Sequence, residues 1–199
     1  MPTGIHLRDA RKQLFDAAER ILVRDGPNAL TSRAVTTEAD CAKGVLHRHF
    51  TDFDGFLAEL VLDRIARLET QAAELREAVG TRTVADNLTE ALTSLFSSVA
   101  VAIISLITFR DELRARLRRD RPAGVPLLTE AAAMLAGYLA AERERGRVAA
   151  DADVDLLAPM LLGSSHLLFA DRTGVPPTTE AVHKMVTSAL AGVVREPRS

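Results

Sequence analysis

Short breaks rich in glycine and proline divide this chain into segments whose apolar residues recur at the spacing of an α-helix. In the first segment Leu14, Ile21 and Leu22 lie on one apolar stripe. This segment ends at "DGP", where Gly26 can form a left-handed C-terminal cap and Pro27 cannot continue the helix. Alternating β-branched runs are scarce, whereas the helix formers alanine, leucine, arginine and glutamate are abundant. We therefore expect an all-α protein with about nine helices.

The expected helices change in character near residue 52. Three short helices are predicted before this point, and long amphipathic helices are predicted after it. The predicted helical ranges are 7–24, 31–39, 43–50, 52–80, 83–99, 101–119, 125–146, 152–171 and 178–194. The change in helix length predicts two domains, at residues 1–52 and 53–199.

The net charge and the single cysteine limit the classes of protein to which the chain can belong. Because the net charge is −2, no overall field attracts the chain to nucleic acid. One cysteine excludes an internal disulfide and fits a reducing cytoplasm. The first residues lack the apolar core of a signal peptide, and the apolar stretch 95–109 is shorter than the roughly 17 to 25 residues of a membrane span. We expect a cytoplasmic protein with no membrane segment.

The sequence "CAKGVLHRHF" at 41–50 contains a local basic cluster with no acidic residue. Before it stands a helix that Thr31 can cap, followed by a tight turn, and Leu46 and Phe50 can anchor the short helix within the cluster. These are the parts of a helix-turn-helix, whose second helix lies in the major groove of DNA. The alternative is a charged helix face that is merely solvated, and composition alone favours that alternative.

The residue types of the basic cluster suit contact with DNA. Lys43 and Arg48 can neutralise phosphates or donate to guanine. Gly44 has no side chain, so the helix can approach the DNA closely. Val45 can contact a thymine methyl group, and the two histidines can donate to phosphate oxygens.

Residues 30–60, "LTSRAVTTEADCAKGVLHRHFTDFDGFLAEL", resemble the DNA-binding signature of the TetR family of transcriptional regulators. The residues that fit the signature are Thr31, Arg33, Val35, Ala39, Lys43, Gly44, Leu46, His49 and Phe50. The resemblance implies that the first three helices bind DNA, that Arg33 reaches a base, and that Thr31 and Ser32 contact phosphate. The expected DNA-binding residues are therefore Thr31, Ser32, Arg33, Lys43, Gly44, Val45, His47, Arg48 and His49.

The chain also departs from the family pattern. Asp40 stands at the usual turn glycine, and aspartate tolerates left-handed geometry better than most residues. Ala42 replaces the serine or threonine that caps the second helix, a loss of roughly 0.5–2 kcal/mol. Threonine, tyrosine and lysine of the pattern are replaced by Val45, His47 and Phe53. A helical interaction or sensor protein with weakened DNA binding is therefore an alternative function.

The resemblance further implies that the middle helices enclose a small-molecule pocket. The stretch 95–109 is apolar on almost every face, so it must be covered by protein or must line a cavity. We expect a mostly apolar pocket in which Tyr138 and His166 orient an aliphatic or small cyclic effector. The expected pocket residues are Phe96, Ile103, Phe109, Met134, Tyr138 and His166.

The resemblance also implies that the last two helices pair with a second subunit. Each carries an apolar stripe that contains small residues and has helical spacing. The expected interface residues are Leu156, Met160, Gly163, Leu167, Val182, Met185, Ala189 and Val193. The alternative is that the stripes face the core of their own subunit.

The remaining polar residues give no indication of catalysis or metal binding. His47 and His49 are two apart and thus lie on different helix faces, and no nucleophile motif or phosphate-binding loop occurs. The arginine-rich segment 109–122 is interpreted as a solvated helix face in which Glu112 and Arg116 pair. We expect no cofactor and no metal, and a small α-helical enzyme is the least favoured alternative. The predicted function is a homodimeric repressor that a small molecule releases from a palindromic DNA operator.

Overall fold

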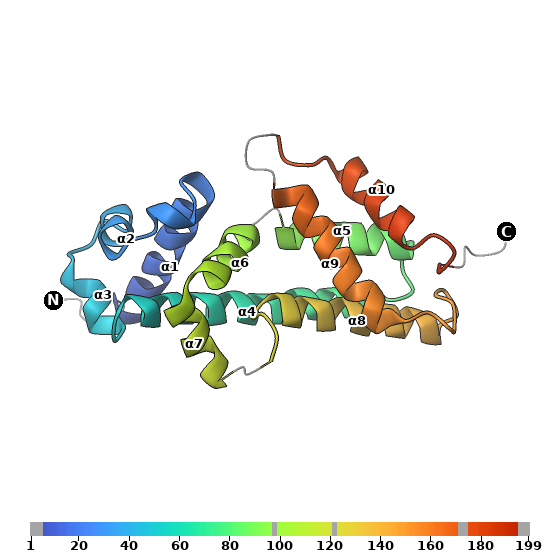
Figure 1. Cartoon of the computed structure of the whole chain (residues 1–199), viewed down its shortest axis with the longest axis horizontal. Helices are drawn as coiled ribbons and strands as arrows, with labels where there is room; N and C mark the ends of the chain where they lie inside the picture. The colour runs from blue at the N-terminus through green and yellow to red at the C-terminus, as the bar shows by residue number, and fades with distance from the viewer. Residues whose placement is uncertain (1–5, 97–98, 121–122, 171–174, 195–199) are drawn as a thin grey trace. The chain divides into compact units, whose positions relative to one another are not determined.

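The computed structural model describes residues 6–96, 99–120, 123–170 and 175–194 (Figure 1). Within these ranges the regular elements are ten α-helices and one short 3-10 helix, so the predicted all-α class is confirmed. The elements are α1 (His6–Arg24), η1 (Pro27–Ala29), α2 (Ser32–Glu38), α3 (Gly44–His49), α4 (Phe53–Glu77), α5 (Val84–Phe96), α6 (Ala100–Phe109), α7 (Asp111–Asp120), α8 (Leu128–Glu144), α9 (Val154–Ala170) and α10 (Thr179–Ala189).

The helices group into two compact units. The first unit comprises residues 1–64 and 102–126, and the second comprises residues 65–101 and 127–199. Helix α4 contributes its first half to one unit and its second half to the other. The functional boundary near residue 52 stays a prediction.

Three phenylalanine rings form the centre of the first unit. Phe15 of α1, Phe50 at the end of α3 and Phe56 of α4 are all buried, and their ring centroids lie 5.0–5.7 Å apart. Aromatic pairs at this separation stabilise a core beyond the area that they bury. The cluster fixes α1, α3 and the start of α4 to one another.

The second unit is a packed group of helices in which α8 lies against α9, and α10 lies against both α5 and α9. Leucines and valines on the facing sides are buried, among them Leu92 of α5, Leu161 of α9 and Val186 of α10. The segment after α10 pairs with the connection between α8 and α9, since Val194 forms an isolated antiparallel bridge with Val148. This packing leaves other faces of α5, α9 and α10 exposed.

The local signals at helix ends act as the sequence predicts. Gly26 has a φ of 81°, in the left-handed region. Thr31 Oγ1 accepts a hydrogen bond from the Ala34 amide at 3.1 Å. Asp52 Oδ1 accepts one from the Gly55 amide at 2.6 Å, at the start of α4.

Several predicted helices are wrong in their extent: the range 178–194 ends at Ala189, and the range 125–146 begins only at Leu128. The range 101–119 is two helices, because α6 ends at Phe109 and α7 begins at Asp111. No glycine or proline marks the break at Arg110. The break instead allows Asp111 and Glu112 to occupy the first turn of a new helix, where negative charge is favourable.

Within the described ranges, no single helix is long and apolar enough to cross a membrane. The bent pair of α5 and α6 meets the length and composition requirement only when the two helices are taken together. Core helices of many proteins meet the same requirement.

Candidate functional site

Ion pairs hold α2 against α1. Arg20 Nε lies 2.8 Å from one carboxylate oxygen of Glu38, and an Arg24 guanidinium nitrogen lies 3.1 Å from the other. The hydrogen bonds from Arg20 and Arg24 lower the pKa of Glu38 below its ordinary value. Because Glu38 is the last residue of α2, these bonds fix the end of the helix that precedes the turn.

The turn between α2 and α3 depends on a residue with positive φ. Asp40 has a φ of 48°, the left-handed geometry expected from its place in the sequence. The amide of Asp40 donates to the Thr37 carbonyl at 3.1 Å, and the amide of Cys41 donates to the Thr36 carbonyl at 3.0 Å. Cys41 is half-buried, and burial raises the pKa of its thiol. The cysteine therefore has the character of a small packing residue.

Buried side chains on one face of helix α3 hold it in the first unit. Leu46 is completely buried and Phe50 is nearly so, as the sequence predicts for the two anchors. The guanidinium of Arg11 lies 4.7 Å from the centroid of the Phe50 ring and pairs with Glu59 of α4. The N-cap position of α3 is Lys43, not the predicted Ala42, and the Lys43 side chain makes no capping hydrogen bond. Tertiary packing alone therefore keeps this six-residue helix folded.

The predicted DNA-binding residues lie on the outward side of α2 and α3. The exposed ones are Thr31, Arg33, Lys43, Gly44, His47 and Arg48, and the half-buried ones are Ser32, Val45 and His49. A Cβ added at Gly44 would meet no atom within 4 Å, so this side of α3 is open.

Three cations on this surface are available to a ligand. The side chains of Arg33, Lys43 and Arg48 form no ion pair and no hydrogen bond with any other described residue. Thr31 accepts from a backbone amide, which leaves its own O–H free to donate. The arrangement offers positive charge and hydrogen-bond donors on one open face.

Arg116 of α7 and Arg110, which lies between α6 and α7, pair with the start of α4, an arrangement that sequence reasoning missed. An Arg116 guanidinium nitrogen lies 2.7 Å from Asp52 Oδ2, and one of Arg110 lies 2.8 Å from Asp54 Oδ1. The Arg110 guanidinium also lies 5.7 Å from the centroid of the Phe53 ring. The segment 109–122 is thus not simply solvated, and Arg116 binds Asp52 where a helical pair within α7 was predicted. The two pairs neutralise both carboxylates that follow α3 in the chain.

The residues predicted to line an effector pocket do not share one environment. In the second unit Phe96 and Met134 are buried, and the centroids of the Phe96 and His166 rings lie 6.1 Å apart. In the first unit Ile103 is buried, whereas the side chain of Phe109 is 84% exposed and lies at the surface. The structure therefore brings Phe96 and His166 together as predicted residues of one site.

Tyr138 belongs to a buried polar network. Its hydroxyl accepts a hydrogen bond from Asn87 Nδ2 at 3.0 Å, and burial raises the pKa of the phenol. The neighbouring Glu142 is completely buried, where it accepts from the Gly80 amide at 3.1 Å and lies 3.4 Å from Arg147 Nε. Because this network already uses the hydroxyl, we assign Tyr138 a structural role in place of the predicted role of orienting a ligand.

The predicted interface residues differ between the two helices. On α9 the three large apolar residues Leu156, Met160 and Leu167 are 56%, 50% and 76% exposed, and Gly163 is exposed between them. On α10 and beyond it, Met185, Ala189 and Val193 are half-buried. Val182 is completely buried in the core of its own protomer, so we exclude it from the interface.

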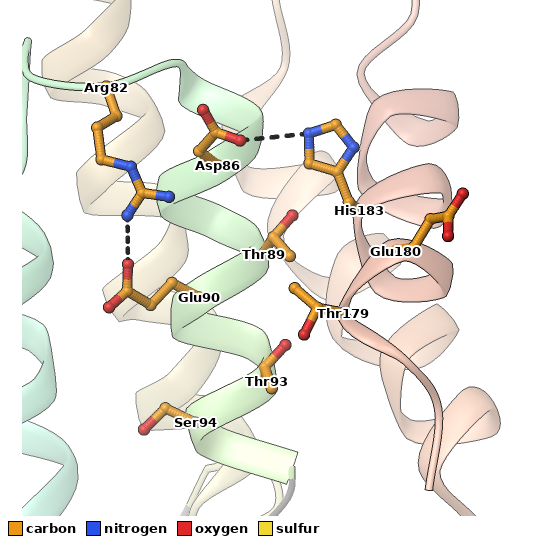
Figure 2. Close-up of a pocket in the computed structure, with 9 residues that line it drawn as sticks. All are labelled: Arg82, Asp86, Thr89, Glu90, Thr93, Ser94, Thr179, Glu180 and His183. Atoms are coloured by element: carbon orange, nitrogen blue, oxygen red, sulfur yellow. Dashed lines mark hydrogen bonds and ion pairs between the residues drawn. The ribbon is translucent and has the colours of Figure 1, made fainter.

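A cleft of about 600 Å³ lies between α5 and α10 (Figure 2), and sequence reasoning missed it. Two ion pairs lie along it. An Arg82 guanidinium nitrogen is 2.6 Å from a Glu90 carboxylate oxygen, and His183 Nε2 is 3.4 Å from Asp86 Oδ1. Among the described residues no group of three or more His, Cys, Asp or Glu side chains is placed to hold a metal ion.

The packed α1–α3 arrangement with an exposed basic α3 defines a helix-turn-helix protein. Residues 14–60 match the family model of the "Bacterial regulatory proteins, tetR family". These residues therefore form a TetR-family amino-terminal domain, as the sequence resemblance indicated. No curated protein sequence gives a significant match to the chain.

Solved structures extend the similarity to the fold of the whole chain. A member of the TetR family from Streptomyces coelicolor has 18% identity and a TM-score of 0.63, with 91% of this chain and 98% of that chain covered. A regulator from Saccharomonospora viridis, solved in complex with choline, has 15% identity, a TM-score of 0.68 and coverage of 95% and 100%. FadR from Bacillus subtilis, in complex with stearoyl-CoA, has 17% identity, a TM-score of 0.61 and coverage of 92% and 97%. At these identities the likeness shows a shared fold.

Proposed function

We propose that the chain is a ligand-responsive transcriptional repressor that binds a palindromic DNA operator as a homodimer in the cytoplasm. The carrying observation is the exposed face of α2 and α3, on which Arg33, Lys43 and Arg48 have no partner among the described residues. Cations that the fold does not use are available to phosphates and base edges.

We assign different DNA contacts to these three cations. Lys43 and Arg48, on the short α3, neutralise phosphates, and Arg33 donates to a guanine edge from α2. Gly44 allows the backbone of α3 to approach the groove, since no atom stands near its missing side chain. Phosphate contacts fix the position of the protein, and the guanine contact gives sequence preference.

The exposed stripe on α9 supports the homodimer. Leu156, Met160 and Leu167 are large apolar side chains that are at least half exposed, and they lie along one face of a single helix. An added Cβ at Gly163 would meet no atom of the described residues within 4 Å, so none of them covers the middle of this face. A two-fold axis would bury the same stripe of both subunits. Helix-turn-helix dimers of this kind bind two DNA half-sites about 34–36 Å apart, one turn of DNA.

Two polar atoms on α9 support an effector site near Phe96. Ser165 Oγ and His166 Nδ1 are buried and have no hydrogen-bond partner among the described residues. The His166 ring lies beside an apolar group, because the Phe96 ring is 5.7 Å from that of Phe169 and 6.1 Å from that of His166. We propose a largely apolar effector whose single polar group binds Ser165 and His166. Two proteins of the same fold are solved in complex with choline and with stearoyl-CoA, which supports a small-molecule site in this chain.

Selection of DNA from a random pool by the purified protein, followed by gel shifts at two salt concentrations, tests DNA binding. Arg33→Ala should weaken binding to the selected DNA by roughly 1–3 kcal/mol and affect random DNA little. Lys43→Ala should weaken both and reduce the salt slope by about one. Equal losses on both DNAs for Arg33→Ala would remove it from base reading.

The same experiment also tests the alternative function. The uncapped start of α3 favours a helical interaction protein that has lost DNA binding, because a helix of six residues without a cap is poorly ordered on its own. If no DNA is enriched at low salt, the alternative replaces the repressor. If a sequence is enriched and Arg33→Ala abolishes the preference, the alternative is excluded.

A further inference from the structure

Four hydroxyl side chains line the cleft between α5 and α10 beside its two ion pairs. Thr89, Thr93 and Ser94 come from α5, and Thr179 comes from the first turn of α10. Figure 2 shows the side chains of Thr93 and Thr179 pointing toward one another. Because a hydroxyl both donates and accepts, a row of them matches a ligand with several hydroxyl groups of its own.

One of these hydroxyls has no partner in the fold. Thr93 Oγ1 is buried and makes no hydrogen bond with any described residue. By contrast, Thr89 donates to the Ala85 carbonyl at 2.7 Å, and Ser94 Oγ accepts from Gln71 at 2.9 Å. A buried hydroxyl without a partner destabilises the fold. Thr93 lines the cleft, and its side chain points toward Thr179 of the facing helix (Figure 2), so a ligand in the cleft is placed to satisfy this hydroxyl.

The charges along the cleft favour a cation. Asp86, Glu90 and Glu180 supply negative charge, and Arg82 supplies the only permanent positive charge among the lining residues. His183 is positive only when protonated. The lining is therefore net negative in either state of the histidine, so it attracts a positively charged ligand and repels an anionic one.

The lining residues also indicate which kind of cation fits. They include no phenylalanine or tyrosine. Quaternary ammonium groups are bound mainly by aromatic faces, whereas a primary ammonium donates three hydrogen bonds to carboxylate and hydroxyl oxygens. The volume of about 600 Å³ is typical of a small-molecule site. We propose that this cleft binds a polyhydroxylated primary amine, of which an amino sugar is the simplest example, at a site separate from the apolar effector site.

Calorimetric titration of the full chain in the absence of DNA tests the ligand chemistry. D-Glucosamine should bind with a dissociation constant in the millimolar range. N-Acetylglucosamine, which keeps the hydroxyl groups and loses the charge, should bind at least about tenfold more weakly, and so should choline. Equal affinities for glucosamine and N-acetylglucosamine would overturn the charge argument, and the absence of binding by glucosamine would overturn the site.

Three variants place the ligand in the cleft. Thr93→Val should leave the thermal stability of the free protein equal or higher, because it removes the unpartnered hydroxyl, yet weaken glucosamine binding about tenfold. Glu90→Gln should weaken it similarly by removing one negative charge. Thr70→Val, an exposed threonine of α4 outside the cleft, is the matched control and should change neither property. Unchanged glucosamine affinity in Thr93→Val and Glu90→Gln would refute the assignment. Since no step uses DNA, failure here is distinguishable from failure of the repressor proposal.

Discussion

Replacement of Tyr138 by phenylalanine removes one hydroxyl group from the interior of the second unit and keeps the aromatic ring. The side chain is completely buried, and its hydroxyl accepts a hydrogen bond of 3.0 Å from Asn87 Nδ2. Loss of such a bond costs about 0.5–1.5 kcal/mol, and an amide left with fewer partners adds to the loss. The amide keeps one bond, because Asn87 Nδ2 also donates to the Ala78 carbonyl at 3.0 Å. We therefore expect a total loss of about 1–2 kcal/mol.

Thermal unfolding followed by circular dichroism measures this loss, at one fixed protein concentration because the melting temperature of a dimer depends on it. For a chain of this length each kcal/mol lowers Tm by about 2–4 °C, so the expected decrease is about 2–8 °C. Asn87→Ala is the matched variant, and the double variant should lose less than the sum of the two single losses. If the Tyr138→Phe protein has the same Tm as the wild type but no longer responds to an effector, the structural role is refuted. Tyr138 would then be a ligand-binding residue.

Three further outcomes follow from the contacts of both units. Leu46→Ala should lower the free energy of unfolding, measured in urea, by about 2–5 kcal/mol, because Leu46 is the completely buried side chain of α3. An unchanged unfolding transition would contradict its anchoring role. Met160→Glu should give a monomer in sedimentation velocity, since the charge lies in the exposed α9 stripe, and a surviving dimer would place the interface elsewhere. The backbone hydrogen bond from Gly55 and the pair with Arg116 lower the pKa of Asp52. Its stabilising contribution is therefore complete above about pH 4 and is lost as the pH falls toward the lowered pKa; Asp52→Asn should flatten this part of the acid unfolding profile, and an identical profile would count against the bond.

The parts of the structure that the sequence predicts are those with a local physical cause. Gly26, Thr31 and Asp52 act on backbone groups within four residues of themselves, so residue type and position suffice to identify them. The anchors Leu46 and Phe50 are also local, because they are the large apolar residues of a very short helix.

The parts that could not be predicted depend on contacts between distant segments. Arg116 could pair with Glu112 in its own helix, and only the packing of α7 on the start of α4 brings Asp52 nearer. The cleft likewise exists because α10 packs on α5, and neither helix alone has the spacing of a known binding motif. Tyr138 illustrates a different limit: a phenol suits both a pocket and a buried network, and burial decides between them.

On and around α3, the residues that hold the helix in the fold differ from those that face solvent. This division affects how the sequence of such a protein can change in evolution. Its inward residue Leu46 and the adjoining Phe50 hold the helix, whereas Lys43, His47 and Arg48 are exposed and contribute little to the fold. Substitutions at exposed positions usually change stability by less than about 0.5 kcal/mol. Gene duplicates can therefore change at these three positions without loss of folding and, under the proposed function, acquire new DNA targets while the rest of the fold stays intact. A library randomised at the same positions should consist mostly of folded members, which makes α3 a favourable starting point for directed evolution.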